Sequence, residues 1–242
     1  SSDSVAYASG GRGVVLERDH GRVHLIDRAA PWQIERTIDV AATDADGGSV
    51  STNPYAAVVS AADEAYVVRY ASNAIVPIAL STGALGAPID LSGEAAAADP
   101  DGFVDVFDGA YDAAAHRAYF VLQRTDQFDY GAAPDYVGAC LAARPLVVAV
   151  DTTTHALVDL DPSSASFGLA LAGANPNSLA FDAANRKLYV ADVGCATDAS
   201  GGRDGRGIEV VDVAAATPTV AWTYHEASTS RLGGSLATSC VA

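Results

Sequence analysis

The stretch AYVVRYASNAIVPIALSTG, residues 65–83, decides the fold. It contains two short runs rich in valine and isoleucine, which are separated at Ser72-Asn73 and end at Thr82-Gly83. Short apolar runs bounded by turn residues are typical of β-strands. Asparagine and glycine also accept the left-handed backbone that tight hairpins require. The stretch therefore predicts the second and third strands of an antiparallel unit, with turns at these two dipeptides.

Looser copies of this unit recur along the chain. Alignment of their second strands places Val14, Tyr66, Tyr119 and Tyr189 in register. The spacing is about 50 residues for the first two intervals and about 70 for the third, which contains loop insertions. Four-stranded units with such a period are typical of propeller blades, which stack around a channel because each has a face it cannot bury alone. The sequence predicts an all-β chain, a β-propeller of four-stranded antiparallel blades.

The repeat also sets the expected domain organisation. We expect residues 1–10 to be an N-terminal tether or closing strand and residues 11–242 to form a single β-propeller domain. Four or five blades are visible, so the ring is incomplete unless the last strand joins blade one. An open ring predicts that the chain is part of a longer protein or that a second polypeptide completes it. The expected blades are 11–48, 53–91, 103–160 and 175–224, with a partial blade at 228–242.

Aspartates recur at the ends of third strands, at Asp27, Asp151 and Asp212. A side chain repeated at the same point of each unit favours a structural role over a catalytic one. Aspartate at a turn accepts hydrogen bonds from the backbone amides that follow it. We therefore expect these three carboxylates to hold hairpins.

Composition limits the function classes. The chain has 242 residues, of which 50% are hydrophobic, and a net charge of −16. This excess of acid repels phosphate backbones, which argues against a nucleic-acid partner. No apolar run reaches the roughly 18 to 20 residues of a transmembrane helix. The absence of methionine and the polar start Ser1-Ser2-Asp3-Ser4 favour an exported chain whose leader has been removed, in the periplasm, on the outer-membrane surface or outside the cell.

Two long insertions, 124–145 and 192–207, interrupt the second-to-third strand connections of adjacent blades. They should emerge side by side on one rim, and each contains one cysteine. A Cys140–Cys195 disulfide is therefore predicted, with Cys240 left over; three reduced cysteines are the alternative. None of the cysteines stands in a zinc-binding Cys-x-x-Cys pair.

An acidic segment at residues 98–112 is the candidate metal site. Carboxylates at Gly-rich turns are typical calcium ligands, although Gly102 directly after Asp101 does not fit the EF-hand spacing. The alternative is a solvated acidic loop between blades, and 43–48 is a weaker candidate of the same kind. The predicted Ca²⁺ ligands are Asp99, Asp101, Asp105 and Asp108.

A ligand site is predicted at the channel mouth. Arg69 and Arg124 each close a second strand, and together with Tyr70 and Asp126 they would bind an anionic ligand. Ion pairs between these arginines and rim aspartates such as Asp126 are the alternative. His20 and His24 flank one hairpin turn and are weak candidates for zinc or copper, since no third ligand is evident.

The repeat resembles the YVTN-type β-propeller family of exported bacterial proteins, which are also likened to surface-layer and lactonase-like propellers. The resemblance covers about four blades, residues 11 to 224, including NPNSLAFDAANRKLYVAD at 175–192. Val68, Arg69 and Ala79 depart from the family pattern, and Pro77 stands inside a strand. The residues at the family's Tyr-Val, Ser-Asn and Thr-Gly marks are Ala65, Tyr66, Val67, Ser72, Asn73, Ile75, Ile78, Thr82 and Gly83.

The segments 91–105 and 118–126 further resemble an envelope-lipoprotein subset of these propellers. That resemblance implies a shared site at Asp99, Asp101 and Arg124, but no reaction. We expect an exported, non-enzymatic binding or scaffold propeller that uses its rim loops to bind a protein or small ligand, with Ca²⁺ as the one expected cofactor. The alternatives are a lactonase-like hydrolase and a quinone or copper redox propeller. For the redox role only Trp32 and Trp222 are available, and neither stands in a recognisable cofactor context. The sequence contains no Gly-x-Ser-x-Gly elbow and no phosphate loop.

Overall fold

The computed structural model describes residues 4–9, 12–27, 29–30, 33–43, 46, 49–96, 101–126, 139–141, 143–196 and 203–225. Four antiparallel sheets form four consecutive blades, which arises because alternating apolar residues give each strand a buried face. Blade one consists of β1 (Ser4–Ser9), β2 (Arg12–Glu17), β3 (Arg22–Asp27) and β4 (Ile34–Asp39). Blade two consists of β7 (Pro54–Ala61), β8 (Glu64–Arg69), β9 (Ala74–Ala79) and β10 (Ile89–Asp90).

The other two blades follow the same order. Blade three consists of β11 (Val106–Asp112), β12 (Arg117–Leu122), β15 (Leu146–Asp151) and β16 (Ala156–Val158), with β17 (Leu169–Ala170) also paired to β15. Blade four consists of β18 (Pro176–Asp182), β19 (Lys187–Asp192), β22 (Gly207–Asp212) and β23 (Thr219–His225). The remaining short elements are β5 (Ala42–Thr43), β6 (Ser49–Val50) and the 3-10 turns η1 (Arg18–His20) and η2 (Ser92–Glu94).

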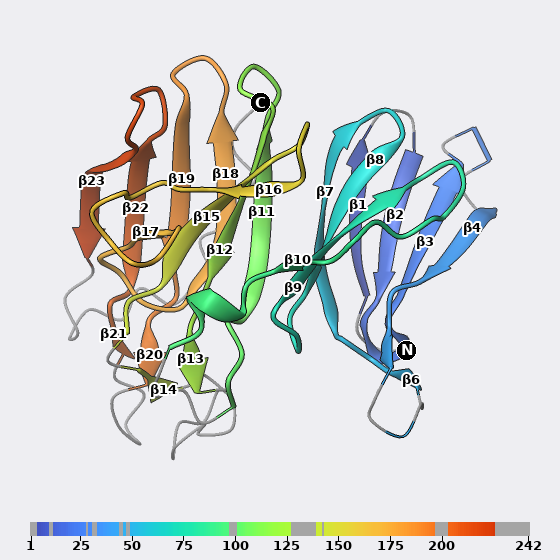
Figure 1. Ribbon diagram of the computed structural model, residues 1–242, viewed down its shortest axis with the longest axis horizontal. Coiled ribbons are helices and arrows are strands. Elements are labelled where there is room, and N and C mark those ends of the chain that lie inside the picture. Colours follow the sequence, from blue (N-terminus) through green and yellow to red (C-terminus); the bar gives the residue numbers. More distant parts are fainter. Residues whose placement is uncertain are drawn as a thin grey trace.

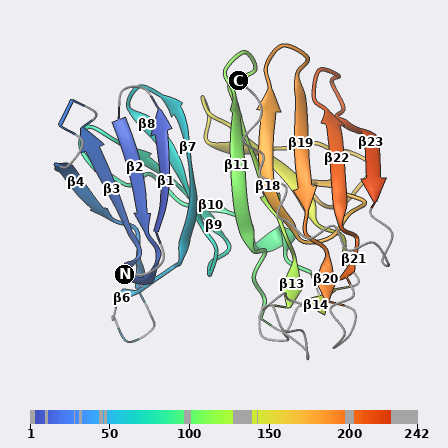
Figure 2. The same cartoon turned by 180° about the vertical axis from the view of Figure 1, so that it is seen from behind.

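The blades are arranged as an arc. The first strands β7, β11 and β18 pack beside one another near the centre, and the outermost strands β4 and β23 lie at opposite ends (Figure 1; Figure 2). The predicted all-β, incomplete propeller is confirmed. The segment Ser4–Ser9 pairs with β2 and is the first strand of blade one, whereas the predicted partial blade at 228–242 lies outside the described residues.

The register of the second strands is confirmed residue by residue. Val14, Tyr66, Tyr119 and Tyr189 are each the third residue of the second strand of their blade. The hairpin aspartates are confirmed as well. The carboxylate of Asp151 accepts the amides of Thr153 and Thr154, and those of Asp27 and Asp212 each accept the amide two residues on.

The beginning of the first strand shows a second repeat. Asn53, Asp105 and Asn175 precede this strand in blades two, three and four, and all three have a left-handed backbone with φ between 49° and 53°. Each is followed by a β-bulge, since the strand register shifts after Pro54, Val106 and Pro176. A bulge leaves one residue unpaired in the ladder and changes the direction of its side chain. These bulges therefore turn one side chain per blade away from the regular sheet.

Apolar clusters fill the three spaces between neighbouring blades. In blade three, Phe120 and Leu122 pack towards blade two, whereas Tyr119 and Val121 pack towards blade four. All four side chains are fully buried. Blade one packs on blade two through a third cluster that includes Leu16. Each inner blade thus uses the alternation of its strands to cover two neighbours.

Close packing between blades predicts a strong effect of replacing Gly109 by alanine. A Cβ at this position would lie 2.6 Å from Val58 Cγ2 and 2.7 Å from Phe120 Cδ1, so β11 and β7 would have to separate. We expect Gly109→Ala to lower the free energy of unfolding by about 1–3 kcal/mol, measured by urea denaturation. Gly93→Ala is the matched control, because no atom lies within 4 Å of its Cβ position. Equal midpoints for both variants would contradict the described blade packing.

Candidate functional site

The two insertions meet on one rim, which we call the insertion rim. They form an additional four-stranded sheet, separate from the blades. Its strands, in order, are β13 (Thr125–Asp126), β14 (Ala139–Cys140), β20 (Cys195–Ala196) and β21 (Arg203–Asp204). In this sheet β14 and β20 pair in parallel and join the two insertions. The additional sheet lies below blades three and four in Figure 1.

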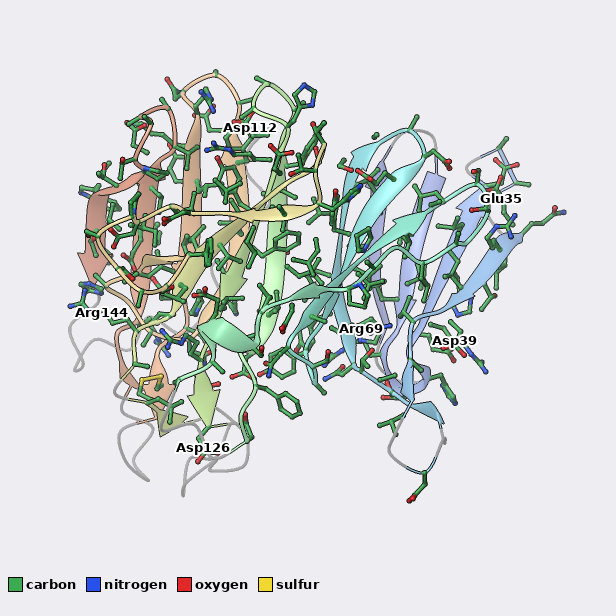
Figure 3. The ribbon with its side chains drawn as sticks, in the orientation of Figure 1. Glu35, Asp39, Arg69, Asp112, Asp126 and Arg144 are labelled. Atoms are coloured by element: carbon green, nitrogen blue, oxygen red, sulfur yellow. A yellow bond between two sulfur atoms is a disulfide. The ribbon has the colours of Figure 1, made fainter. Side chains whose placement is uncertain are left out.

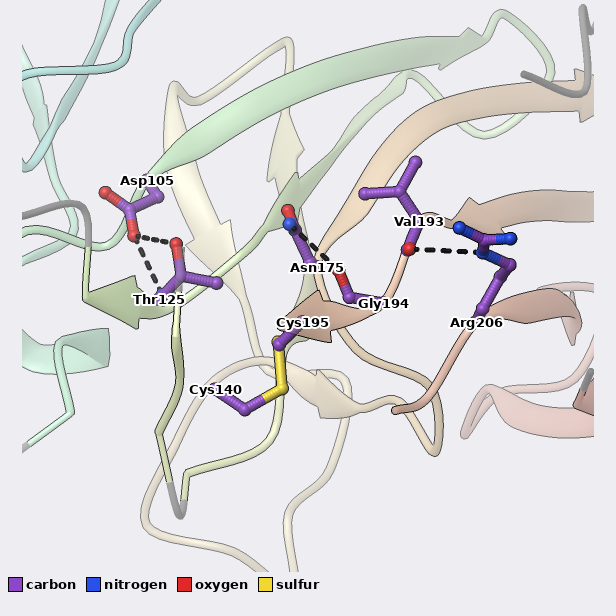
Figure 4. Close-up of a disulfide and its surroundings, with 8 residues drawn as sticks. All are labelled: Asp105, Thr125, Cys140, Asn175, Val193, Gly194, Cys195 and Arg206. Atoms are coloured by element: carbon purple, nitrogen blue, oxygen red, sulfur yellow. Dashed lines mark hydrogen bonds between the residues drawn. A yellow bond between two sulfur atoms is a disulfide. The ribbon is translucent and has the colours of Figure 1, made fainter. Parts of the chain in front are cut away.

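A disulfide connects the same two insertions (Figure 4). Cys140 and Cys195 are bonded, with their Cα atoms 5.1 Å apart. The predicted bridge is confirmed, as is the expectation that both insertions emerge on the same rim. Cys240 lies outside the described residues.

A small cavity of about 90 Å³ lies beside this disulfide. Its wall is formed where the connections of blades three and four meet, and it is too small for a drug-sized molecule. It offers room for a small polar group or a few water molecules. Its polar lining consists of Gln123, Arg124, Thr125, Arg144 and Asn175, next to the two cysteines.

The residues with left-handed backbone hold the walls of this cavity (Figure 4). Fully buried Asp105 accepts hydrogen bonds on Oδ2 from the Thr125 amide, at 2.9 Å, and from the Thr125 hydroxyl, at 3.2 Å. In blade four, Asn175 donates its side-chain amide to the carbonyl of Gly194 at 3.2 Å. The same position in two blades therefore anchors both insertions at their first residues.

Two arginines, Arg124 and Arg144, are among the residues that line the cavity. Arg124 donates from Nη1 to the backbone carbonyl of Arg144 at 2.8 Å, and the Arg144 side chain is exposed. Planar guanidinium groups suit carboxylate and phosphate oxygens. The chain has only 14 basic residues against 30 acidic ones, and two of its arginines line this one cavity.

An aromatic cluster, Tyr55, Tyr70 and Phe107, adjoins the cavity. The rings of Tyr55 and Phe107 lie 4.2 Å apart and those of Tyr55 and Tyr70 lie 5.0 Å apart. The guanidinium of Arg18 from blade one lies 3.7 Å above the Tyr55 ring, a cation–π contact. Tyr55 and Phe107 are the residues released by the bulges of blades two and three.

Gln123 links the aromatic cluster to the cavity. Its Oε1 accepts the hydroxyl of Tyr70 at 3.0 Å, and its side-chain amide donates to the carbonyl of Pro176 at 3.1 Å. Gln123 is 4% exposed, so both contacts are shielded from solvent. Gln123 thus connects Tyr70 of blade two to Pro176 of blade four through two hydrogen bonds.

A buried carboxyl pair lies behind the cavity wall. Glu209 is fully buried and accepts the amides of Ala172, at 2.8 Å, and Gly173, at 2.5 Å. Asp192 is 4% exposed, and neither of its carboxyl oxygens has a hydrogen-bond partner among the described residues. Burial, with a further contribution from the negative charge of Glu209, raises the pKa of Asp192 to about 9. Asp192 is therefore protonated at neutral pH.

The arginines predicted for the ligand site are not equivalent. Arg69 is the last residue of β8, whereas β12 ends at Leu122 and Arg124 lies beyond it, so the prediction of matching positions is wrong. Arg69 is 8% exposed, and its Nη2 donates to the Ala41 carbonyl at 3.4 Å. Burial lowers its pKa, while the charge of Asp39 opposes that shift. Figure 3 shows Arg69 and Asp39 at blades one and two, far from Arg144 and Asp126 at the insertion rim.

Of the four predicted ligand residues, Arg124 lines the cavity and Tyr70 reaches it through Gln123. Asp126 lies in β13, paired with Ala139. Ligand binding by these residues stays a prediction. Arg144, Tyr55 and Phe107 were not predicted. A usable signal was present, because NPY at 53–55 and DVF at 105–107 place an aromatic residue at the same position of two blades.

The predicted calcium ligands take part in backbone hydrogen bonds. The Asp101 carboxylate accepts the Phe103 amide, and Asp105 holds Thr125. Asp108 accepts the amides of Gly109 and Leu179, and burial raises its pKa to about 6. No three His, Cys, Asp or Glu side chains in the described part of the chain are grouped to hold a metal. Asp99 lies outside that part, and calcium binding stays a prediction.

The two histidines of blade one share a partner. His20 Nδ1 lies 3.0 Å and His24 Nε2 lies 3.1 Å from the carboxylate of Glu17. The hydrogen bond with His24 is the main reason that the pKa of Glu17 lies below its ordinary value. Both histidines therefore contact the same carboxylate, and metal binding there stays a prediction.

No protein-family description and no curated protein sequence matches the chain. Solved structures do match. Hydrazine synthase from Kuenenia stuttgartiensis is 12% identical with a TM-score of 0.57, over 86% of this chain and 45% of that one. Virginiamycin B lyase from Staphylococcus aureus is 12% identical with a TM-score of 0.52, over 87% and 53%. The WD40 domain of Toxoplasma gondii coronin is 12% identical with a TM-score of 0.51, over 92% and 45%.

These matches establish the fold alone. The structures are β-propellers, and this chain spans about half the length of each. They include a synthase, a lyase and a WD40 domain, so the fold leaves both catalysis and binding open. Within the described residues, no helix is long and apolar enough to cross a membrane. The chain has the β-propeller fold.

Proposed function

We propose that this protein is an exported, non-enzymatic binding propeller that holds a small anionic ligand at the insertion rim. The observation that carries the proposal is the pair Arg124 and Arg144 at a cavity whose walls are fixed by the Cys140–Cys195 disulfide. A rigid wall lowers the entropy cost of positioning polar groups around a ligand. An oxidising compartment favours such a bridge, which supports export.

The aromatic cluster extends the proposed site beyond the cavity. The cavity accepts a carboxylate or phosphate group, and Tyr55 and Phe107 offer ring surface next to it through Tyr70 and Gln123. The ligand class is therefore a molecule with one anionic group and a flat apolar part. The resemblance of residues 65–83 to the repeat of exported YVTN-type propellers supports the export part of the proposal.

Titration calorimetry with phenyl phosphate, inorganic phosphate and phenol tests the proposal. We expect phenyl phosphate to bind more tightly than either fragment, because only it has both the anionic group and the ring. Arg144→Gln should weaken its binding by about tenfold, since hydrogen bonds to charged groups contribute about 1.5–3 kcal/mol. Arg22→Gln is the matched control, an exposed arginine of blade one that pairs with Glu17.

Two results would contradict the proposal. Equal affinities of phenyl phosphate for the wild type and Arg144→Gln would remove the cavity from the binding site. Release of phenol during the titration would show catalysis and would favour the hydrolase alternative.

Calcium chloride, added in the same kind of titration, tests the separate cofactor prediction for Asp101, Asp105 and Asp108.

A further inference from the structure

One face of blade four has no neighbour among the described residues, although its residues repeat a face that is covered in blade three. Cross-strand pairing places Tyr189, Val210 and Trp222 in one row. The corresponding row of blade three pairs Tyr119 with Ala149, and both side chains are 0% exposed because blade four covers them. The open face of blade four is thus the structural equivalent of a blade-to-blade interface.

Exposed aromatic rings mark this open face. Trp222 is 53% exposed and Tyr224 is 49% exposed, and their rings stack 6.2 Å apart on β23. Tyr224 lies in a row with Ile208 and Ala191, beside the row of Trp222. Large apolar side chains gathered on one face of a soluble protein indicate an interaction surface.

Blade one has a second open face at the other end of the arc. Its covered face, with Val14 and Leu16, packs on blade two. The opposite face includes Ile26 and Ile34, which are paired directly, and Ile34 is 57% exposed. Each end of the arc therefore carries a large exposed apolar residue on its outermost strand.

The two open faces point the same way. In Figure 2 the sheets of blades one and four both lie towards the viewer, and no described strand lies in front of them. A partner protein bound on the side that faces the viewer in Figure 2 would contact both open faces at once. The solved propellers that match this chain are about twice its length, so a ring of their size has room beside this chain for a body about as large as the chain itself.

We propose that a second copy of this chain covers both faces. Blade four of each copy packs on blade one of the other, with Trp222 and Tyr224 set against the face that carries Ile26 and Ile34. The same interface then occurs twice, related by a two-fold axis along the channel, and no open face remains. Two sets of four blades give a ring of eight, at the upper end of the usual range of blade numbers.

Sedimentation velocity on the wild-type chain tests the proposal without any mutation. We expect a species of about 49 kDa, twice the 24.6 kDa of one chain, at micromolar concentration. Trp222→Glu and Ile34→Glu should each raise the dimer dissociation constant at least 100-fold, because each introduces a charge into one side of the same interface. Phe167→Glu is the matched control, an exposed apolar residue of blade three that is 46% exposed. Far-ultraviolet circular dichroism shows whether each variant is folded.

Each other outcome overturns the proposal. A wild-type chain that stays at 24.6 kDa up to 100 micromolar would show that something else covers these faces, such as further blades of a longer polypeptide. Dissociation by Trp222→Glu but not by folded Ile34→Glu would show that two copies meet through blade four alone. Dissociation by Phe167→Glu would place the contact elsewhere.

Discussion

Replacing Asp192 by asparagine is expected to stabilise the protein by about 2–4 kcal/mol at pH 7. The carboxyl of Asp192 is 4% exposed and lies next to fully buried Glu209, which already accepts two backbone amides. Ionisation of Asp192 would put a second negative charge into the same buried space. Asparagine has nearly the same shape and no charge in either state, so this cost disappears.

The stabilisation by Asp192→Asn is expected to increase with pH. The pKa of Asp192 rises from an ordinary value of 3.8 to about 9, so between these values the folded state binds a proton that the unfolded state has released. The contribution of Asp192 to stability is complete below about pH 4 and falls by about 1.4 kcal/mol per pH unit as pH rises towards 9. The gain from Asp192→Asn should therefore be small at pH 4 and largest at pH 8 to 9.

Urea denaturation of both proteins between pH 4 and pH 9 measures this difference. Asp212→Asn is the matched control, because the Asp212 carboxylate lies at a hairpin and accepts the Ala214 amide. That variant should lose up to about 1 kcal/mol, with no gain at high pH. A stability difference between Asp192→Asn and the wild type that does not grow with pH would show that Asp192 is ionised in the folded protein.

Removing the disulfide is expected to be the second large effect. Cys140 and Cys195 are 55 residues apart, so their bond closes a long loop and restricts the unfolded chain. Serine at both positions should lower the free energy of unfolding by about 2–4 kcal/mol. The same variant should weaken phenyl phosphate binding, since both cysteines line the cavity.

Urea denaturation under oxidising conditions compares the free energy of unfolding with and without the disulfide. Both proteins lack the third thiol, Cys240. Cys240→Ser serves as the parent, so that no thiol can exchange with the bridge. The double serine variant in that background should unfold at lower urea, whereas the parent should match the wild type. Equal midpoints of the parent and the double variant would show that the insertion rim is held by its sheet pairing alone.

The repeat made the fold predictable. Tyr66, Tyr119 and Tyr189 recur with the same neighbours, because each occupies the same position of a second strand. The turn at Gly83, where φ is 77°, requires a residue that accepts a left-handed backbone, whereas Asn73 does not have this backbone. The disulfide was predictable for the same reason. Once the blades are in register, two insertions at equivalent connections must emerge together, and each held one cysteine.

The candidate site was only partly predictable. Arg69 and Arg124 look alike in the sequence, since each follows an apolar run. In the structure Arg69 ends a strand and is buried beside Asp39, whereas Arg124 lies beyond its strand and lines the cavity. That difference depends on the last residue of each strand. A short apolar run in the sequence does not determine which residue that is.

Two further features depend on three-dimensional contacts alone. The aromatic cluster arises because bulges turn Tyr55 and Phe107 out of their ladders, and hydrophobic alternation does not show a bulge. Asp192 and Glu209 belong to adjacent strands, β19 and β22, and are brought together only by the pairing of those strands. The second insertion separates the two carboxyl residues in the sequence, so no short sequence motif predicts their contact.

Amide chemical-shift mapping with phenyl phosphate tests ligand binding at the insertion rim, because it reports the site of binding on the whole propeller. Binding at the insertion rim predicts that shift changes concentrate at residues 123–126, 139–145, 173–175 and 195, with weaker changes at 55, 70 and 107. Changes confined to the hairpins of the opposite rim, at 61–64 and 112–117, would contradict it.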